Sequence, residues 1–104
     1  MDINNDRDFI NTIGTKQERT FANVHIQHIL DRVKDMFFGY AITEETRINM
    51  AEYIHIELEY LAAKNIIPAF LWITDNEVTI KDNPNGPYSL DVILPESLEM
   101  WLDG

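Results

Sequence analysis

The sequence predicts an α+β protein, with two amphipathic helices packed on a small three-stranded, mainly antiparallel sheet and with extended N- and C-terminal arms. Two observations predict this fold. Residues 21–65 repeat apolar side chains at helical intervals, and after Pro68 short apolar runs alternate with turn-forming residues, as strands do. With 104 residues, the chain has the length of one domain. We therefore expect an N-terminal arm over residues 1–18 and a single α+β domain with a C-terminal tail over residues 19–104.

The N-terminal residues predict an arm rather than a packed element. Residues 1–14 are rich in Asn and Asp, and their sparse apolar side chains are Ile3, Phe9, Ile10 and Ile13. Polar terminal segments of this kind are poorly ordered unless a partner or the body of the domain holds them.

The first helix is expected to begin near Phe21 and to end near Gly39. Apolar positions recur every three or four residues, and polar residues take the other face. Glycine is preferred just past a helix C-terminus because it adopts the left-handed backbone without strain. The apolar positions are Val24 or Ile26, Ile29, Leu30, Val33, Met36 and Phe37.

The second helix is expected to begin at Thr43, a residue type whose side chain caps helix N-termini. Glu44 and Glu45 follow in the first turn, where carboxylates interact favourably with the helix dipole. Asn65, with Pro68 three residues further on, ends the helix. The predicted buried stripe is Ile48, Ala51, Ile54, Leu58, Leu61 and Ala62.

Three short segments are predicted as strands of an antiparallel meander. Residues 69–74 form a nearly continuous apolar run, which fits a buried strand. Residues 78–81 and 90–94 alternate apolar and polar side chains, and the residues between them, 82–87, nearly all favour turns. Residues 95–104 are then left as a tail.

The composition limits the classes of partner. Eighteen acidic residues against eight basic ones give a formal net charge of -10. Such a surface repels phosphate, so nucleic acid and anionic membranes are disfavoured and a basic protein partner is favoured. The chain has no cysteine, no signal peptide pattern and no long apolar run, so we expect a protein made in the cytoplasm, not secreted and without a membrane partner.

The sequence carries no motif that predicts an enzyme or a cofactor. His25 and His28 lie three apart on the first helix and could share a metal, but a third ligand, such as His55, would have to come from the other helix. The acidic residues fit a solvated helix face, and the four glycines are too far apart to cradle a phosphate. We expect a protein without catalytic, cofactor or metal sites.

The apolar residues near the two ends are predicted to bind a partner. Trp101, with Leu98 and Leu102, makes the C-terminal end apolar, so it packs either on its own domain or on a neighbouring subunit. Tryptophan is a frequent anchor of interfaces. The predicted partner-binding residues are Phe9, Ile10, Ile13, Leu98, Met100, Trp101 and Leu102.

The order of elements resembles the C-terminal domain of contractile phage tail sheath proteins and the shorter baseplate sheath-initiator proteins. The matching stretches are Arg19, Asn23 with Val24, residues 26–37, 43–47, 58–61, 70–75 and 90–95. The resemblance implies a structural role in the virion tail, in which extended ends of one subunit add strands to the sheet of its neighbour. Residues 4–13 and 97–102 are the segments expected to exchange, with further copies or tube, sheath and baseplate proteins as partners.

The net charge leaves a second hypothesis open. A small acidic protein encoded by a phage can occupy a basic groove of a host protein and inhibit it. Added salt separates the two hypotheses, because an acidic mimic loses its partner as salt rises and strand exchange does not.

Overall fold

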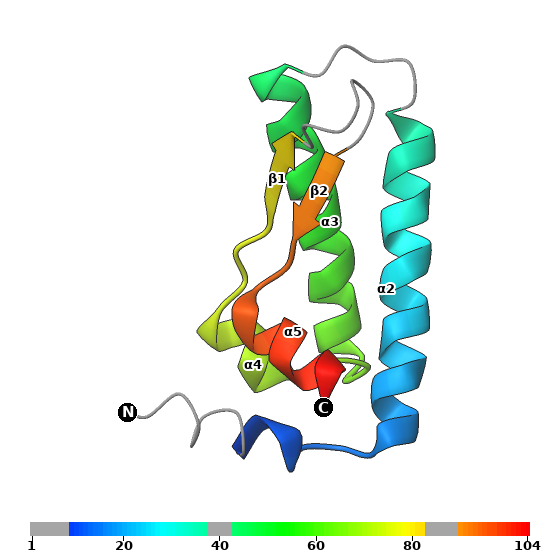
Figure 1. Ribbon diagram of the computed structural model, residues 1–104, viewed down its shortest axis with the longest axis vertical. Helices are drawn as coiled ribbons and strands as arrows, with labels where there is room; N and C mark the ends of the chain where they lie inside the picture. Colours follow the sequence, from blue (N-terminus) through cyan, green and yellow to red (C-terminus); the bar gives the residue numbers. More distant parts are fainter. Residues whose placement is uncertain (1–8, 38–42, 83–89) are drawn as a thin grey trace.

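The computed structural model describes residues 9–37, 43–82 and 90–104. After a helical turn at residues 9–11, the elements follow in the order α2 (Lys16–Met36), α3 (Glu44–Ala63), α4 (Ala69–Thr74), β1 (Thr79–Asp82), β2 (Leu90–Ile93) and α5 (Glu96–Asp103) (Figure 1). Helix dominates the described chain, and its one sheet has two strands. The predicted fold, two helices on a three-stranded sheet, is therefore wrong in its sheet and in its number of helices. The predicted C-terminal arm is also wrong, because that segment is a helix, whereas residues 1–8 of the predicted N-terminal arm lie outside the described residues.

Helix α2 begins earlier than the predicted start near Phe21. Thr15 caps it, because its side-chain oxygen accepts a hydrogen bond from the backbone N–H of Glu18 at 3.1 Å. Thr-x-x-Glu is the sequence pattern of a capping box, a signal that the apolar spacing alone does not carry. The helix ends at Met36, and Gly39 lies outside the described residues.

Helix α3 begins and ends where the sequence predicts. The side-chain oxygen of Thr43 accepts a hydrogen bond from the backbone N–H of Thr46 at 3.1 Å. At the other end Asn65 has a φ of 59°, and the backbone N–H of Ile66 donates to the Leu61 carbonyl at 2.9 Å. This pattern is the Schellman motif, so the cap at Thr43 and the end at Asn65 are both confirmed.

Helix α4 replaces the predicted first strand. A short continuous apolar run has no period, so it fits a buried strand and a buried helix equally. The backbone N–H of Leu71 donates to the Pro68 carbonyl at 3.1 Å, and both Leu71 and Trp72 are buried. The apolar run is thus a short helix that buries two of its side chains, and the predicted three-stranded sheet loses one strand.

Strands β1 and β2 form an antiparallel hairpin close to the two predicted runs. Thr79 pairs with Ile93, and Ile80 pairs with Val92. Most of the predicted turn between the strands, residues 83–87, lies outside the described residues. Both strands therefore have an edge that pairs with no other strand in the described part of the chain.

Helix α5 replaces the extended C-terminal arm. Leu98 and Trp101 lie three residues apart, and both are buried on the side of the helix that faces the chain. Glu96 and Glu99 lie in its first turn, where carboxylates stabilise a helix. The apolar spacing of this segment is helical, and burial of the two large side chains holds the helix in place.

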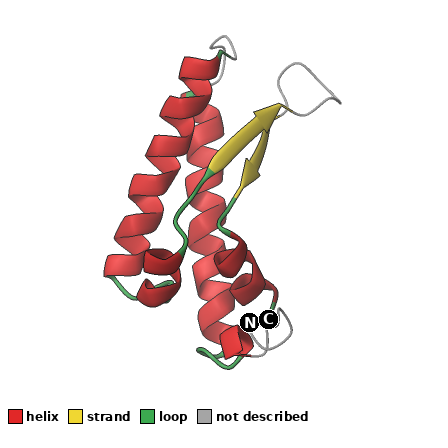
Figure 2. Cartoon of the chain, turned by 90° about the vertical axis from the view of Figure 1, so that its left-hand side faces the viewer, coloured by secondary structure: helices red, strands yellow, loops and turns green. Residues whose placement is uncertain are grey.

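The core lies where these elements meet. Figure 1 shows α2 and α3 side by side, with the hairpin in front of α3 and with α4 and α5 together at its lower end. In the side view of Figure 2, the hairpin lies on one side of the long helices. The largest fully buried side chains are Trp101, Ile26, Met50, Ile54, Leu58, Ile67 and Val33.

Candidate binding surfaces

The two ends of the described chain meet at one peptide group. Trp101 Nε1 donates a hydrogen bond to the carbonyl oxygen of Ile13 at 2.8 Å. Nη2 of Arg19, a side chain that is only 8% exposed, donates to the same oxygen at 3.2 Å and also to the carbonyl of Asn11. The segment before α2 is thus fixed to both α2 and α5, and neither described end is an extended arm.

Most of the residues predicted to bind a partner pack on the chain itself. Ile10, Leu98 and Trp101 are buried in the core, and three others are partly buried against it: Ile13, Met100 and Leu102. Phe9 is the exception, because it is 60% exposed and its ring contacts that of Phe70 edge-on at 6.3 Å. Residues 97–102 lie within α5, so their addition to another sheet would require that helix to unfold.

In the described part of the chain, large apolar side chains are exposed in four places, one of which is Ile93 on β2. Phe9, Phe70 and Ile73 lie at the end of the molecule that carries α4, and Ile73 is 78% exposed. Phe21, Val24 and Met36 are exposed on α2. Ile48, Ile56 and Tyr60 are exposed on α3.

The side of α3 that faces away from the core is both apolar and acidic. Glu45, Ile48, Glu52, Ile56 and Glu59 recur at intervals of three and four residues, which places them on one side of a helix. We call these five residues the outer face of α3. The three glutamates are exposed, and the two isoleucines are 58% and 57% exposed. None of the five belongs to the buried stripe of α3.

On one side of the outer face, an ion pair connects α3 to α2. Nη1 of Arg32 lies 3.8 Å from Oε2 of Glu57. The pKa of Arg32 is raised above its ordinary value, first by a hydrogen bond and charge interaction with the Tyr53 hydroxyl and then by the Glu57 carboxylate. Glu45, Glu52 and Glu59 take no part in this ion pair, and the described residues show no cation paired with them.

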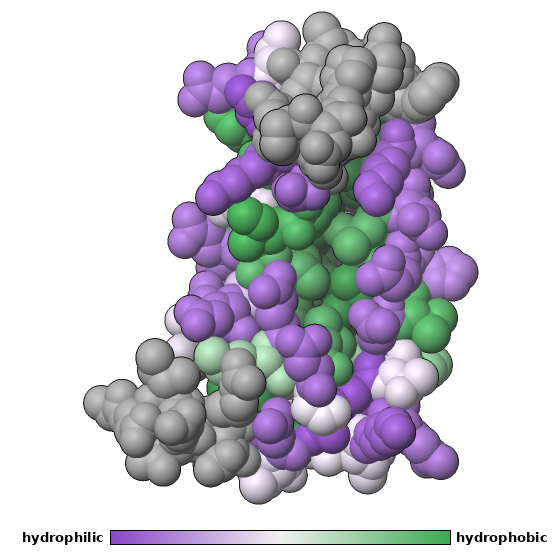
Figure 3. All heavy atoms as spheres, in the orientation of Figure 1, coloured by the Kyte–Doolittle hydropathy of each residue, from purple (hydrophilic) through white to green (hydrophobic). Residues whose placement is uncertain are grey.

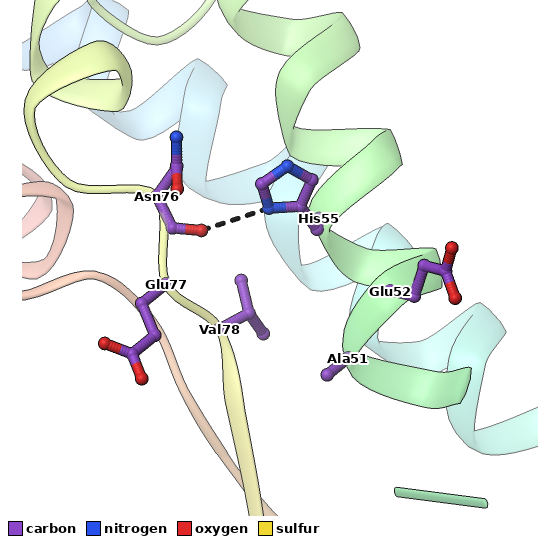
Figure 4. A pocket seen from close by; sticks show the side chains of 6 residues that line it. All are labelled: Ala51, Glu52, His55, Asn76, Glu77 and Val78. Atoms are coloured by element: carbon purple, nitrogen blue, oxygen red, sulfur yellow. Dashed lines mark hydrogen bonds between the residues drawn. The ribbon is translucent and has the colours of Figure 1, made fainter. Parts of the chain in front are cut away.

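On the other side, a shallow pocket of about 340 Å³ separates α3 from the segment before β1. Nδ1 of His55 lies 3.0 Å from the carbonyl oxygen of Asn76, which joins the two walls (Figure 4). Glu52 and Glu77 point away from each other in Figure 4, so their carboxylates do not converge on a common point. The pocket therefore lacks the convergent charged groups that a catalytic site uses.

The two histidines considered as metal ligands are placed as ordinary surface residues. The His25 ring contacts the Phe21 ring edge-on at 4.6 Å. Within the described residues there is no group of three or more His, Asp and Glu side chains that could hold a metal ion. A metal at His25 and His28 thus has no third ligand in that part of the chain.

An apolar band lies beside the hairpin. Figure 1 shows β2 between β1 and α2, so the edge of β2 that pairs with no described strand is on the side of α2. In the same orientation, Figure 3 shows a band of apolar side chains between the hairpin and α2, bordered by polar residues on both sides. A strand edge and an exposed apolar surface therefore adjoin.

Comparisons with known proteins leave the chain without a family. No family model, curated protein or solved structure matches it. In the described residues, no helix combines the length and the apolar character needed to cross a membrane.

Sequence reasoning missed the outer face of α3. The sequence analysis assigned Ile48 to the buried stripe of α3 and did not single out Ile56. In the structure Ile48 is exposed, and Met50, which was not part of the predicted stripe, is buried. The assignment of Ile48 is wrong because α3 has apolar residues on two sides, and spacing alone does not rank them. The signal that could have found the face is the recurrence of glutamate every seven residues, at 45, 52 and 59.

Proposed function

We propose that this chain is a non-catalytic component of a larger protein assembly and that it binds a neighbour at the free edge of β2. The observation that carries the proposal is the position of that edge, unpaired and beside an apolar band (Figures 1 and 3). An added strand would pair with the edge of β2 that pairs with no other described strand, and it would cover the apolar side chains next to that edge.

In this proposal the chain receives a strand, whereas the sequence suggested that its own ends supply one. The C-terminal segment cannot supply a strand while it is folded as α5, because its side chains Leu98 and Trp101 are buried in the core. The receiving role rests on the edge of β2, which pairs with no other strand among the described residues.

The resemblance to contractile-tail proteins gives the finer form of the proposal. The assembly would be the tail of a virion, and the neighbours would be further copies or tube, sheath and baseplate proteins. Two helices followed by an antiparallel strand pair agree with that resemblance, whereas the helix at Ala69–Thr74, where the family has a strand, departs from it. The support for this finer form is therefore the sequence pattern.

A cross-linking experiment tests the proposal, because the chain has no cysteine and a single one can be introduced. Ile93→Cys on β2 is labelled with a photoreactive maleimide, and Asp31→Cys on the exposed side of α2 serves as the control. We expect position 93 to give defined adducts with another copy or a second structural protein, and position 31 to give none. Adducts with tube, sheath or baseplate proteins would support the finer form of the proposal, in which the assembly is the tail of a virion.

Two results would contradict the proposal. One is a chain that stays monomeric at millimolar concentration in sedimentation equilibrium and that also forms no adduct with a second structural protein. The other is a yield of adducts at position 93 no higher than at position 31. Defined adducts with proteins that belong to no contractile tail would contradict a role in a virion tail. They would still support a component of a larger assembly that binds a neighbour at β2.

The second candidate function, an acidic inhibitor that occupies a basic groove, is favoured by a different observation. Glu45, Glu52 and Glu59 form an exposed acidic line on α3 and pair with no cation among the described residues. Such a line suits a basic surface. Loss of a partner on addition of salt would favour this candidate over strand addition.

A further inference from the structure

We infer that the outer face of α3 is a second docking surface, which binds a basic, amphipathic helical segment of a different protein. This surface is separate from the edge of β2 and does not depend on strand addition. Three features of the chain support this inference: the apolar residues of the face, the elements that flank it, and the spacing of its charges.

Helix α3 is apolar on two opposite sides. Met50, Ile54 and Leu58 form the buried stripe at intervals of four residues and are at most 2% exposed. Ile48 and Ile56, eight residues apart, lie on the opposite side and are more than half exposed. The outer side of a surface helix is normally polar, so the two exposed isoleucines leave apolar surface among the glutamates of this face.

The described elements cover α3 only on its other sides. Arg32 brings α2 to Glu57, and Asn76 brings the segment before β1 to His55. Residues 57 and 55 lie on either side of Ile56, so the outer face is the strip of helix surface between these two contacts. In the described part of the chain the strip is open to a partner.

The charges of the face specify the chemistry of that partner. Glu45, Glu52 and Glu59 are spaced by seven residues, which corresponds to about 10 Å along a helix. Ile48 and Ile56 lie between them, so acidic and apolar groups alternate along the strip. The complementary surface is a helix with lysine or arginine at heptad spacing and apolar side chains between them.

A second copy of the chain does not fit this face. A symmetric dimer through α3 would place the two lines of glutamate against each other, and like charges at such a seam destabilise it. The formal net charge of -10 adds to that repulsion. The occupant is therefore a segment of another protein, with the opposite charge.

Binding of a synthetic peptide to the full-length chain tests the inference. The probe is a labelled three-heptad helix with leucine at the apolar positions and lysine beside them, and the control peptide has glutamate in place of lysine. We expect fluorescence anisotropy to show binding of the lysine peptide alone. Because the face contributes three partly screened charges, Glu45→Gln, Glu52→Gln and Glu59→Gln together should weaken binding about tenfold.

A matched variant separates this face from general attraction to an acidic protein. Asp31→Asn, Asp35→Asn and Asp103→Asn remove the same charge from exposed positions elsewhere. In addition, the methyl NMR signals of Ile48 and Ile56 should shift on binding, whereas that of Ile93 on β2 should not. Equal weakening by both triple variants, or binding of the glutamate peptide, would overturn the inference without bearing on the edge of β2.

Discussion

Nε1 of Trp101 donates a hydrogen bond of 2.8 Å to the carbonyl oxygen of Ile13, a residue 88 positions earlier in the chain. Arg19 donates to the same oxygen, so one peptide group joins α5, α2 and the segment before α2. Trp101 is 2% exposed, and its ring fills the space between these elements. The contact explains why both described ends are packed although the sequence suggested arms.

Trp101→Phe should lower the free energy of unfolding. The variant loses the indole N–H and part of the ring volume, which together should cost about 1–3 kcal/mol. Trp101→Ala, which leaves a larger cavity, should cost about 3–5 kcal/mol. Urea denaturation followed by circular dichroism measures both losses.

Trp72→Phe is the matched control. Trp72 is also buried, but its Nε1 has no hydrogen-bond partner among the described residues. Removal of a buried N–H without a partner relieves a desolvation cost, so this variant should lose less stability than Trp101→Phe. A larger loss for Trp72→Phe would mean that ring packing, and not the bond to Ile13, accounts for the role of Trp101.

Arg19→Met should loosen the segment before α2. The side chain is buried and donates to the carbonyls of Asn11 and Ile13, so its removal should cost about 1–3 kcal/mol. Hydrogen exchange of the amides at residues 11–14 should become faster. Arg32→Met is the comparison, because the Arg32 side chain is 56% exposed and its ion pair should contribute only about 0–1 kcal/mol. Equal losses in the two variants would contradict this role of Arg19.

The long helices and the hairpin were predictable because their signals are local. Thr43 and Asn65 mark the ends of α3, and they act on backbone groups within a few residues. The alternation of residues 78–81 and 90–94 likewise predicts the strands that pair. Each of these signals survives in the structure because tertiary contacts agree with it.

The short helices α4 and α5 were not predictable, because their conformation depends on distant contacts. The nearly continuous apolar run of residues 69–74 has no period that distinguishes a strand from a helix. It forms a helix because that conformation buries Leu71 and Trp72 against the rest of the chain. Trp101 could have packed on its own domain or on a neighbour, and its partner, Ile13, lies at the other end of the chain. No sequence window of helical length contains both residues.

Asn65 offers a test of how α3 ends. Its φ of 59° lies in the left-handed region, which glycine adopts freely and asparagine more easily than other residues. Asn65→Ala should therefore destabilise the chain by about 1 kcal/mol, whereas Asn65→Gly should be neutral or slightly stabilising. Thermal unfolding of the two variants gives the order of their melting temperatures. An alanine variant as stable as the glycine variant would contradict the left-handed assignment.

Ile48 and Ile56 should be replaceable without loss of stability, although both are large apolar residues in the middle of a helix. Ile48→Ala and Ile56→Ala should each change the free energy of unfolding by no more than about 0.5 kcal/mol, because both side chains are mostly exposed. Ile54→Ala, at a position with 0% exposure, should cost about 2–5 kcal/mol. Urea denaturation separates the two classes. If Ile48→Ala or Ile56→Ala cost as much as Ile54→Ala, these side chains would pack on the chain itself, and the outer face of α3 would have no free apolar surface for a partner.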